Sequence, residues 1–162
     1  SGGVGGALIQ LAKRRGARVI AMASQSKHAA VAELGPDRIL PRSPSDLGAL
    51  LQDEQVTVVA DVVGGSIWPS LIGCLERGGR YACSGAIAGP LVEFDLRTFY
   101  LRDLTLVGST VVSTDILPSV VRYIERGEIK PVLAATYELS DLKSAQAAFI
   151  DKKHTGNIVV IP

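Results

Sequence analysis

The sequence lacks an excess of either charge. Its 162 residues carry 17 Lys and Arg against 16 Asp and Glu, a formal net charge of +1. A protein that binds nucleic acid or an anionic membrane surface needs a basic face, and this composition offers no surplus for one. We therefore expect neither nucleic acid nor a membrane as a partner.

Long apolar runs are also missing. The longest of them, Val56–Val63, is interrupted by polar residues, and it is far shorter than the roughly 20 apolar residues that a bilayer-spanning helix needs. The N-terminal stretch has neither the basic head nor the cleavable apolar segment of a secretory signal. These absences predict a cytoplasmic protein.

Potential metal ligands are scarce. The only two cysteines, Cys74 and Cys83, fit no CxxC spacing, and with the two histidines, His28 and His154, they form no zinc-ligand pattern. We interpret the cysteines as buried, reduced thiols. No metal site is predicted in this sequence.

Short β-branched runs alternate with longer stretches of helical spacing, a pattern typical of βαβ units with a parallel sheet. The expected strands are Arg18–Ala23, Arg38–Leu40, Val56–Val63, Arg80–Ser84, Leu104–Val107 and Gly156–Ile161. The expected helices are the one after the first glycines, Ser26–Leu34, Ser45–Gln52, Ser66–Glu76, Leu117–Glu125 and Leu142–Ile150. Gly78–Gly79 is expected to break the chain before a strand. The pattern predicts an α/β fold.

The chain opens on a glycine-rich turn, SGGVGGALIQLAKRRGARVIAM, that leads into an apolar helix. A helix N-terminus offers unpaired N–H groups and a partial positive charge, which suit a pyrophosphate. Gly2 and Gly5 have the spacing of the second and third glycines of the GxGxxG motif. Taken alone, the turn is equally compatible with a helix start that binds nothing.

A dinucleotide-binding fold places the end of its second strand beside the adenosine ribose. The sequence there reads ASQSKH, from Ala23 to His28, and it contains no Asp or Glu to hold both ribose hydroxyls of NAD. Ser24 and Lys27 can instead hydrogen-bond and neutralise a 2′-phosphate, which favours NADP(H). The alternative is a helix cap followed by a solvated lysine.

The whole chain resembles the cofactor-binding part of the medium-chain dehydrogenase/reductase superfamily, with closest similarity to quinone oxidoreductases and zinc-type alcohol dehydrogenase-like proteins. The resemblance is carried by SGGVGGALIQLAKRRGARVIA, VTVVADVVGGSIWPSLIGCLERGGRYACSGAIAG, FDLRTFYLRDLTLVGSTV and HTGNIVVIP. It implies a Rossmann-type doubly wound parallel sheet, lacking its first strand in this sequence. Residues 1–128 would form the NADP(H)-binding domain, and 129–162 would return to a GroES-like substrate domain that is otherwise missing.

The resemblance also assigns cofactor contacts by position. Gly2, Gly3, Val4 and Gly5 correspond to the pyrophosphate turn, and Ser24 and Lys27 to the 2′-phosphate end. Asp61, Val62 and Val63 correspond to the adenosine half and the ribose, while Gly85, Ala86, Ser109 and Val111 correspond to backbone positions near the nicotinamide amide. Val62 and Val63 are also compatible with a pure core role, and we interpret Trp68 and Tyr100 as packing or interface residues. The catalytic residues, and the zinc ligands where zinc is used, would belong to the missing domain.

These features predict the cofactor-binding part of an NADP(H)-dependent reductase that transfers hydride to or from a carbonyl, enone or quinone. The segment alone is expected to be inactive. One alternative is an S-adenosylmethionine-dependent methyltransferase-like domain, because Leu75–Cys83 resembles a pattern of that class, although the second strand lacks the acidic end it would need. The other alternative is a non-catalytic interaction module that retains the fold.

Two expectations concern strand edges. Family members pair through an edge strand of the cofactor domain, so the resemblance implies a homodimer through Leu104–Val111. The missing first strand would lie between Arg18–Ala23 and Val56–Val63. Residues before Ser1, direct closure of the two neighbouring strands, or Asn157–Ile161 as a substitute would fill that place.

Overall fold

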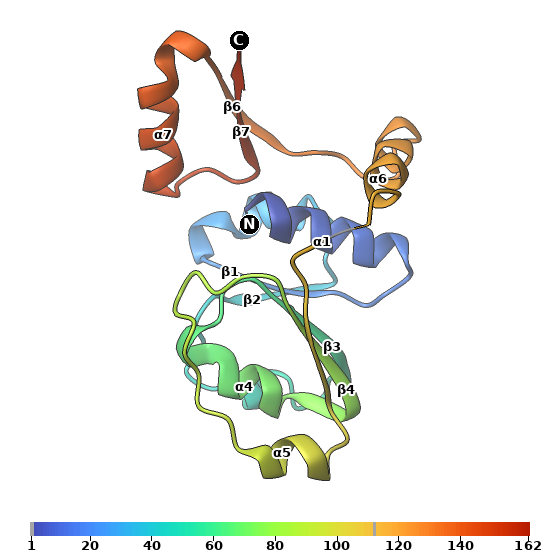
Figure 1. Ribbon diagram of the computed structural model, residues 1–162. Coiled ribbons are helices and arrows are strands. Elements are labelled where there is room, and N and C mark those ends of the chain that lie inside the picture. Colours follow the sequence, from blue (N-terminus) through green and yellow to red (C-terminus); the bar gives the residue numbers. More distant parts are fainter. Residues whose placement is uncertain (1, 112) are drawn as a thin grey trace. The chain divides into compact units, whose positions relative to one another are not determined.

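The computed structural model describes residues 2–111 and 113–162, so Ser1, the first residue of the glycine-rich turn, lies outside the described part (Figure 1). The chain divides into two compact units, one made of Ser1–Arg42 and Thr114–Pro162 and the other of Ser43–Ser113. All strand pairs of the described residues are parallel, in the orders β1–β2, β3–β4–β5 and β6–β7. The α/β class with parallel sheets is therefore confirmed. No helix in the described part is both long and apolar enough to cross a membrane.

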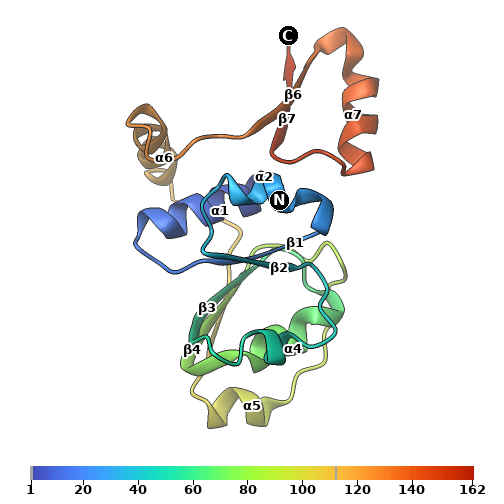
Figure 2. The same ribbon diagram turned by 180° about the vertical axis from the view of Figure 1, so that it is seen from behind.

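In the first unit, two helices pack on a pair of strands (Figure 2). The helices are α1 (Gly3–Arg14) and α2 (His28–Ala32), preceded by the 3₁₀ turn η1 (Gln25–Lys27), and the strands are β1 (Ile20–Ala23) and β2 (Arg38–Pro41). Ile9 of α1, Ala21 and Ala23 of β1 and Val31 of α2 form a buried apolar cluster. The apolar face of α1 and the alternating side chains of β1 thus build this core, as their spacing predicts.

The same unit contains the C-terminal elements α6 (Ile116–Glu125), β6 (Leu133–Glu138), the 3₁₀ turn η3 (Leu139–Asp141), α7 (Leu142–Asp151) and β7 (Asn157–Ile161). α7 lies beside the β6–β7 pair (Figure 1). The Gln10 side chain ties α1 to the segment before β6, since its amide nitrogen donates to Lys130 O at 2.9 Å and its oxygen accepts from Lys130 N at 2.7 Å. Arg14 adds an ion pair to Glu128.

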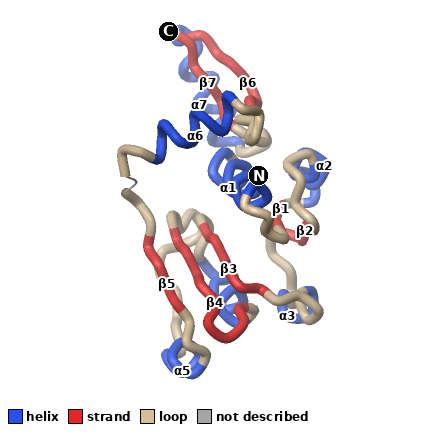
Figure 3. The backbone as a smooth tube through the Cα atoms, turned by 90° about the vertical axis from the view of Figure 1, so that its right-hand side faces the viewer, coloured by secondary structure: helices blue, strands red, loops and turns tan. Residues whose placement is uncertain are grey.

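The second unit contains a three-stranded sheet and short helices, which can be followed in Figure 3. Its elements are α3 (Leu47–Leu50), β3 (Val56–Asp61), η2 (Gly65–Ile67), α4 (Trp68–Gly73), β4 (Leu75–Cys83), α5 (Leu96–Leu101) and β5 (Thr105–Gly108). Trp68 is buried and meets the rings of Tyr81 and Phe94 edge to face, at centroid distances of 5.9 and 4.9 Å. The interpretation of Trp68 as a packing residue is confirmed, whereas Tyr100 is exposed.

The expected break at Gly78–Gly79 appears as an interruption of strand pairing. β4 runs over Leu75–Cys83, but its register against β3 jumps from Leu75 opposite Val56 to Arg80 opposite Val58, so residues 76–79 have no partner on β3. Gly78 takes a φ of +76°, and a Cβ at the buried Gly79 would lie 2.8 Å from Glu76 O. The two glycines therefore form an irregularity within one strand.

The hypothesis that Asn157–Ile161 replaces the missing first strand is wrong. This segment is β7, and it pairs along its length with β6, a strand that the sequence analysis did not predict. Within residues 2–111 and 113–162, β1 pairs with β2 alone and β3 pairs with β4 alone. The apolar run of β7 is thus already used, because Leu133–Glu138 supplies a parallel partner.

Gly156, which directly precedes β7, has a φ of +96° and is buried. A Cβ at this position would overlap Val132 O and the Val132 side chain. We expect Gly156→Ala to lower the free energy of unfolding by about 1–3 kcal/mol, because it adds backbone strain to a steric overlap. Urea denaturation measures the change.

Gly73 in α4 is the matched control for Gly156. A Cβ there meets no atom within 4 Å, so Gly73→Ala should leave stability unchanged or raise it by up to about 1 kcal/mol. Equal stability of Gly156→Ala and the wild type would contradict the close approach of β7 to Val132.

Candidate functional site

The glycine-rich turn forms the N-terminal end of α1. Gly2 is the N-cap in extended conformation, and the first intrahelical bond runs from Gly6 N to Gly2 O at 2.9 Å. The N–H groups of Val4 and Gly5 consequently have no acceptor within the helix. A Cβ at Gly2 or Gly5 would meet no atom within 4 Å, and the Val4 side chain is 63% exposed. The turn therefore offers open space and N–H donors to an anion.

The C-terminal segment approaches this turn, which no local sequence signal indicated. Gly2 makes an isolated parallel bridge to Gly156, and a Cβ at Gly3 would overlap the side-chain oxygen of Asn157. A cavity of about 120 Å³ is lined here by α1, α6 and segments 129–132 and 155–157. A side chain at Gly3 would therefore displace the Asn157 amide.

The end of β1 carries the residues predicted to select the cofactor. Ser24 is the N-cap of η1 but makes no capping bond, and its Oγ lies 3.4 Å from that of Ser26. Lys27 Nζ donates to the carbonyl oxygens of Lys152 and His154, both at 2.6 Å. Lys27 is thus half-buried and held by backbone oxygens, unlike the solvated lysine of the alternative reading. An ammonium has three N–H donors, so one remains for an anion.

Asp61 ends β3 and is only 6% exposed. Its Oδ1 accepts from Val63 N at 2.7 Å, and its Oδ2 accepts from Gly64 N at 3.1 Å and from the Tyr81 hydroxyl at 2.8 Å. Both carboxylate oxygens are therefore engaged within the protein, where they shape the turn after β3. The predicted position of Asp61 beside a ribose stays a prediction.

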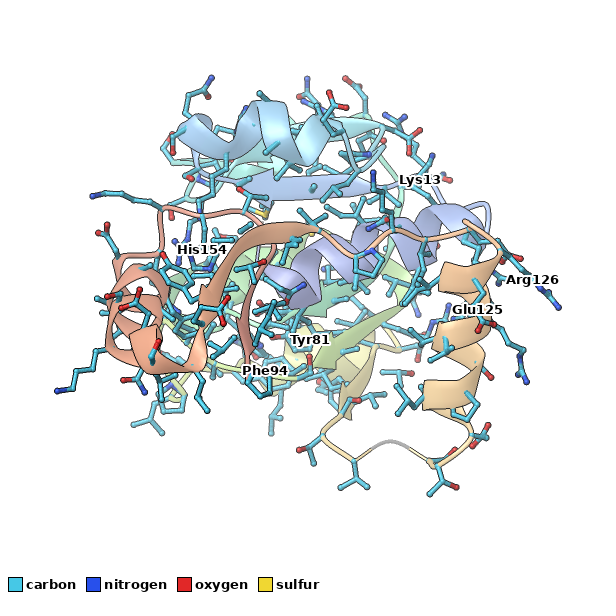
Figure 4. All side chains as sticks on the ribbon, turned by 90° about the horizontal axis from the view of Figure 1, so that it is seen from above. Lys13, Tyr81, Phe94, Glu125, Arg126 and His154 are labelled. Carbon is cyan, nitrogen blue, oxygen red and sulfur yellow. The ribbon has the colours of Figure 1, made fainter. Side chains whose placement is uncertain are left out.

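Tyr81, which is labelled in Figure 4, shares this buried network through its bond to Asp61. Burial first, and then the hydrogen bond to the Asp61 carboxylate, raise the pKa of Tyr81 well above its ordinary value. The hydroxyl consequently stays protonated at neutral pH and can donate a hydrogen bond to Asp61. Sequence reasoning missed this residue, because nothing in the local pattern links a tyrosine on β4 to an aspartate on β3.

The remaining predicted residues lie at the carboxyl ends of β3, β4 and β5, which parallel pairing brings to one edge of the sheet. Val62 and Val63 are half-buried, and a Cβ at Gly85 would lie 3.1 Å from Val62 O. Ser109 N donates to Cys83 O at 2.8 Å, whereas Ala86 and Val111 are exposed. A cavity of about 230 Å³ at this edge is lined by Trp68, Cys83, Ala86, Val107 and Gly108 among others. This is the edge where open parallel sheets bind ligands.

Parallel α/β units with a glycine-rich turn at the first helix define the class of Rossmann-type cofactor-binding domains. Within that class the chain belongs to the zinc-binding dehydrogenase family, whose sequence pattern matches residues 3–126. It corresponds to the C-terminal, cofactor-binding part of medium-chain dehydrogenases/reductases.

Two of the curated relatives carry names of a reductase and an oxidoreductase. The chain is 30% identical over 169 residues to an acryloyl-coenzyme A reductase of Sulfurisphaera tokodaii, covering 100% of the chain and 48% of that protein. It is 28% identical over 167 residues to a chloroplastic NADPH-dependent alkenal/one oxidoreductase of Arabidopsis thaliana, covering 100% of the chain and 39% of that protein. The chain thus spans half or less of the length of these relatives.

Solved structures of the family have the same fold. A protein of Sinorhizobium meliloti, assigned as an alcohol dehydrogenase, shares 43% identity at a TM-score of 0.94, covering 100% of this chain and 46% of that one. An NAD-dependent alcohol dehydrogenase shares 28% identity at a TM-score of 0.88, covering 99% of this chain and 49% of that one.

The residues described here do not fit a zinc ion. Among residues 2–111 and 113–162, no three His, Cys, Asp or Glu side chains lie close enough together to hold a metal. Cys74 and Cys83 are free thiols, each half-buried, and burial raises the pKa of the Cys74 thiol. A raised pKa keeps that sulfur protonated, which opposes metal binding. The described part of the chain therefore offers zinc no set of ligands.

Proposed function

We propose that this chain is the NADP(H)-binding part of a medium-chain reductase. The observation that carries the proposal is the end of β1, where Ser24 and Lys27 stand in place of the carboxylate that would hold an NAD ribose. A 2′-phosphate fits this position, because the remaining N–H of Lys27 can donate to it and the positive charge neutralises it.

The open turn at α1 fits the pyrophosphate of the same cofactor. The N–H groups of Val4 and Gly5 would hold the phosphate oxygens, with the helix dipole adding a favourable charge. The strand-end positions Gly85, Ala86, Ser109 and Val111 would orient the nicotinamide through their backbone. The bound cofactor supplies the hydride, and the contribution of this chain is to bind and orient it.

The names of two relatives support a substrate class. The Sulfurisphaera protein is an acryloyl-coenzyme A reductase and the Arabidopsis protein an alkenal/one oxidoreductase, so both names describe a carbon–carbon double bond activated by a neighbouring carbonyl. We propose an enone or enoyl substrate of this kind, with a carbonyl or quinone substrate as the alternative. Cytoplasmic location is part of the same proposal.

A calorimetric titration of the protein with NADPH, NADH and S-adenosylmethionine tests the proposed function. We expect NADPH to bind more tightly than NADH, and S-adenosylmethionine not to bind. Tighter binding of S-adenosylmethionine would favour the methyltransferase-like alternative. Absence of binding by all three would favour a non-catalytic module, and tighter binding of NADH would place this chain with NAD-dependent relatives.

We further propose a homodimer through the edge strand region Leu104–Val111. β5 lies at the edge of its three-stranded sheet, and Val107 is 47% exposed. An exposed apolar edge strand is a template for pairing with a second copy. Val107→Lys is expected to shift the protein from dimer to monomer in sedimentation velocity at micromolar concentration.

Val121→Lys on α6 is the control for this substitution, because Val121 is 43% exposed and lies outside the β3–β4–β5 sheet. It should leave the dimer intact. A wild-type protein that sediments as a monomer would contradict the edge-strand proposal.

A further inference from the structure

We infer that the loop Lys152–His154, near the end of the chain, is part of the cofactor site at the end of β1 and helps to set the preference for NADPH. The inference rests on the proposed function, since it assumes that Lys27 meets the 2′-phosphate. Its structural basis is the pair of 2.6 Å hydrogen bonds from Lys27 Nζ to Lys152 O and His154 O.

These two bonds fix the direction of the Lys27 ammonium. A lysine side chain has four rotatable bonds and, when solvated, spreads its charge over many positions. Two carbonyl acceptors occupy two of the three N–H groups and hold the third in one orientation. A 2′-phosphate then meets a positioned donor whose side-chain entropy has already been lost in the free protein.

The carbonyls are held by the conformation of the loop itself. α7 ends at Asp151, and Lys152 takes a left-handed conformation with φ +56° and ψ +18°. The Lys152 ammonium lies 3.9 Å from the centre of the Phe149 ring, and the His154 ring packs on the same phenylalanine at 5.9 Å. Figure 4 labels His154 in this C-terminal region. The loop is therefore anchored on α7.

One further observation fits a polar ligand at this loop. His154 Nδ1 is buried and has no hydrogen-bond partner in the described part of the chain, which is unusual for a buried ring nitrogen. The Lys153 ammonium is paired with Asp151 at 2.8 Å. The contacts of the loop with Lys27 are made by the backbone oxygens of Lys152 and His154, so backbone conformation is the property to perturb.

Lys152→Val and Lys152→Gly form the matched pair for the test. Both remove the same ammonium, but glycine adopts the left-handed conformation easily and valine strongly disfavours it. We expect Lys152→Val to lower the ratio of NADPH to NADH affinity by about tenfold, a loss typical of one charge-assisted bond. Lys152→Gly should keep the wild-type ratio, as measured by calorimetry.

Hydrogen exchange in the cofactor-free protein provides a second readout. Lys27→Met should speed amide exchange in Lys153–Gly156, because the loop loses its tie to η1, while exchange in β4 stays unchanged. Unchanged exchange of the loop would overturn the inference even if Lys152→Val does not fold.

The outcomes for the inference and for the proposed function can be distinguished. If Lys27→Met lowers the NADPH to NADH ratio and Lys152→Val does not, the proposed function stands and the role of the loop is overturned. If Lys27→Met leaves the ratio unchanged, the proposed function itself fails. Reduction of the ratio by both substitutions, with a double variant no worse than Lys27→Met alone, is the expected result.

Discussion

Replacing Lys27 with methionine is expected to weaken NADPH binding by roughly 10- to 150-fold and to change NADH binding little. The substitution keeps an apolar stem but removes a charge-assisted hydrogen bond worth about 1.5–3 kcal/mol. The effect should be selective, because only NADPH carries the phosphate that the ammonium at the end of β1 would meet. Calorimetric titration of both cofactors measures the ratio directly.

Lys13→Met is the control for this experiment. Lys13 belongs to the same unit and also makes hydrogen bonds through its ammonium, but its partner is the Asp37 carboxylate at 2.8 Å. This substitution also removes one positive charge, and it breaks the Lys13–Asp37 ion pair as well. A selective loss of NADPH binding in Lys27→Met but not in Lys13→Met therefore does not come from the change in net charge. Equal losses for NADPH and NADH in the Lys27 variant would contradict the assignment of Lys27 to the 2′-phosphate.

Asp61→Ala is expected to produce the largest loss of stability, lowering the free energy of unfolding by about 3–5 kcal/mol. The carboxylate accepts from two backbone N–H groups and from the Tyr81 hydroxyl, and it is almost fully buried. Removing it leaves two buried donors and one part-buried donor without a partner, at about 1–3 kcal/mol each with incomplete additivity. Urea denaturation measures the loss.

Tyr81→Phe separates the parts of this network. It removes one donor and leaves the two backbone bonds of Asp61 in place, so it should cost about 1.5–3 kcal/mol, clearly less than Asp61→Ala. A loss below about 0.5 kcal/mol in Asp61→Ala would show that the carboxylate does not hold the turn.

The raised pKa of Tyr81 also predicts a pH dependence. In the unfolded chain a tyrosine ionises near pH 10, whereas in the folded protein its pKa is higher. The stability from this group is therefore fully present below about pH 10 and decreases as the pH rises above it. Tyr81→Phe should lack this part of the alkaline decrease.

The long, strongly patterned elements could be predicted from the sequence. The helix of Gly3–Arg14 and the strand of Val56–Asp61 follow from the apolar spacing of their residues. The short helix Leu96–Leu101 was missed because six residues carry too little periodicity, although Asp95 caps it by accepting from Arg97 N at 2.9 Å. The strand Leu133–Glu138 was missed because its sequence, LAATYE, contains no β-branched apolar residue and only one large aliphatic one.

The candidate site was predictable where it depends on local chemistry and not where it depends on distant contacts. The open glycine turn follows from its composition. Two contacts could not be predicted: the approach of Asn157 to Gly3, and the hydrogen bonds of Lys27 to Lys152 and His154. The partners in each contact are more than 120 residues apart in the sequence. Asp61 has the right position at a strand end, but its burial and its bond to Tyr81 required the structure.

Competition between two adenosine nucleotides tests the central claim most directly. Adenosine 2′,5′-bisphosphate and adenosine 5′-monophosphate differ only in the 2′-phosphate, so their relative affinities isolate the contacts at the end of β1 from those of the glycine turn. We expect the bisphosphate to displace bound NADPH at a concentration at least roughly 10-fold below the one that the monophosphate needs. A factor of this size is consistent with one charge-assisted bond. Equal displacement by both nucleotides would contradict the account.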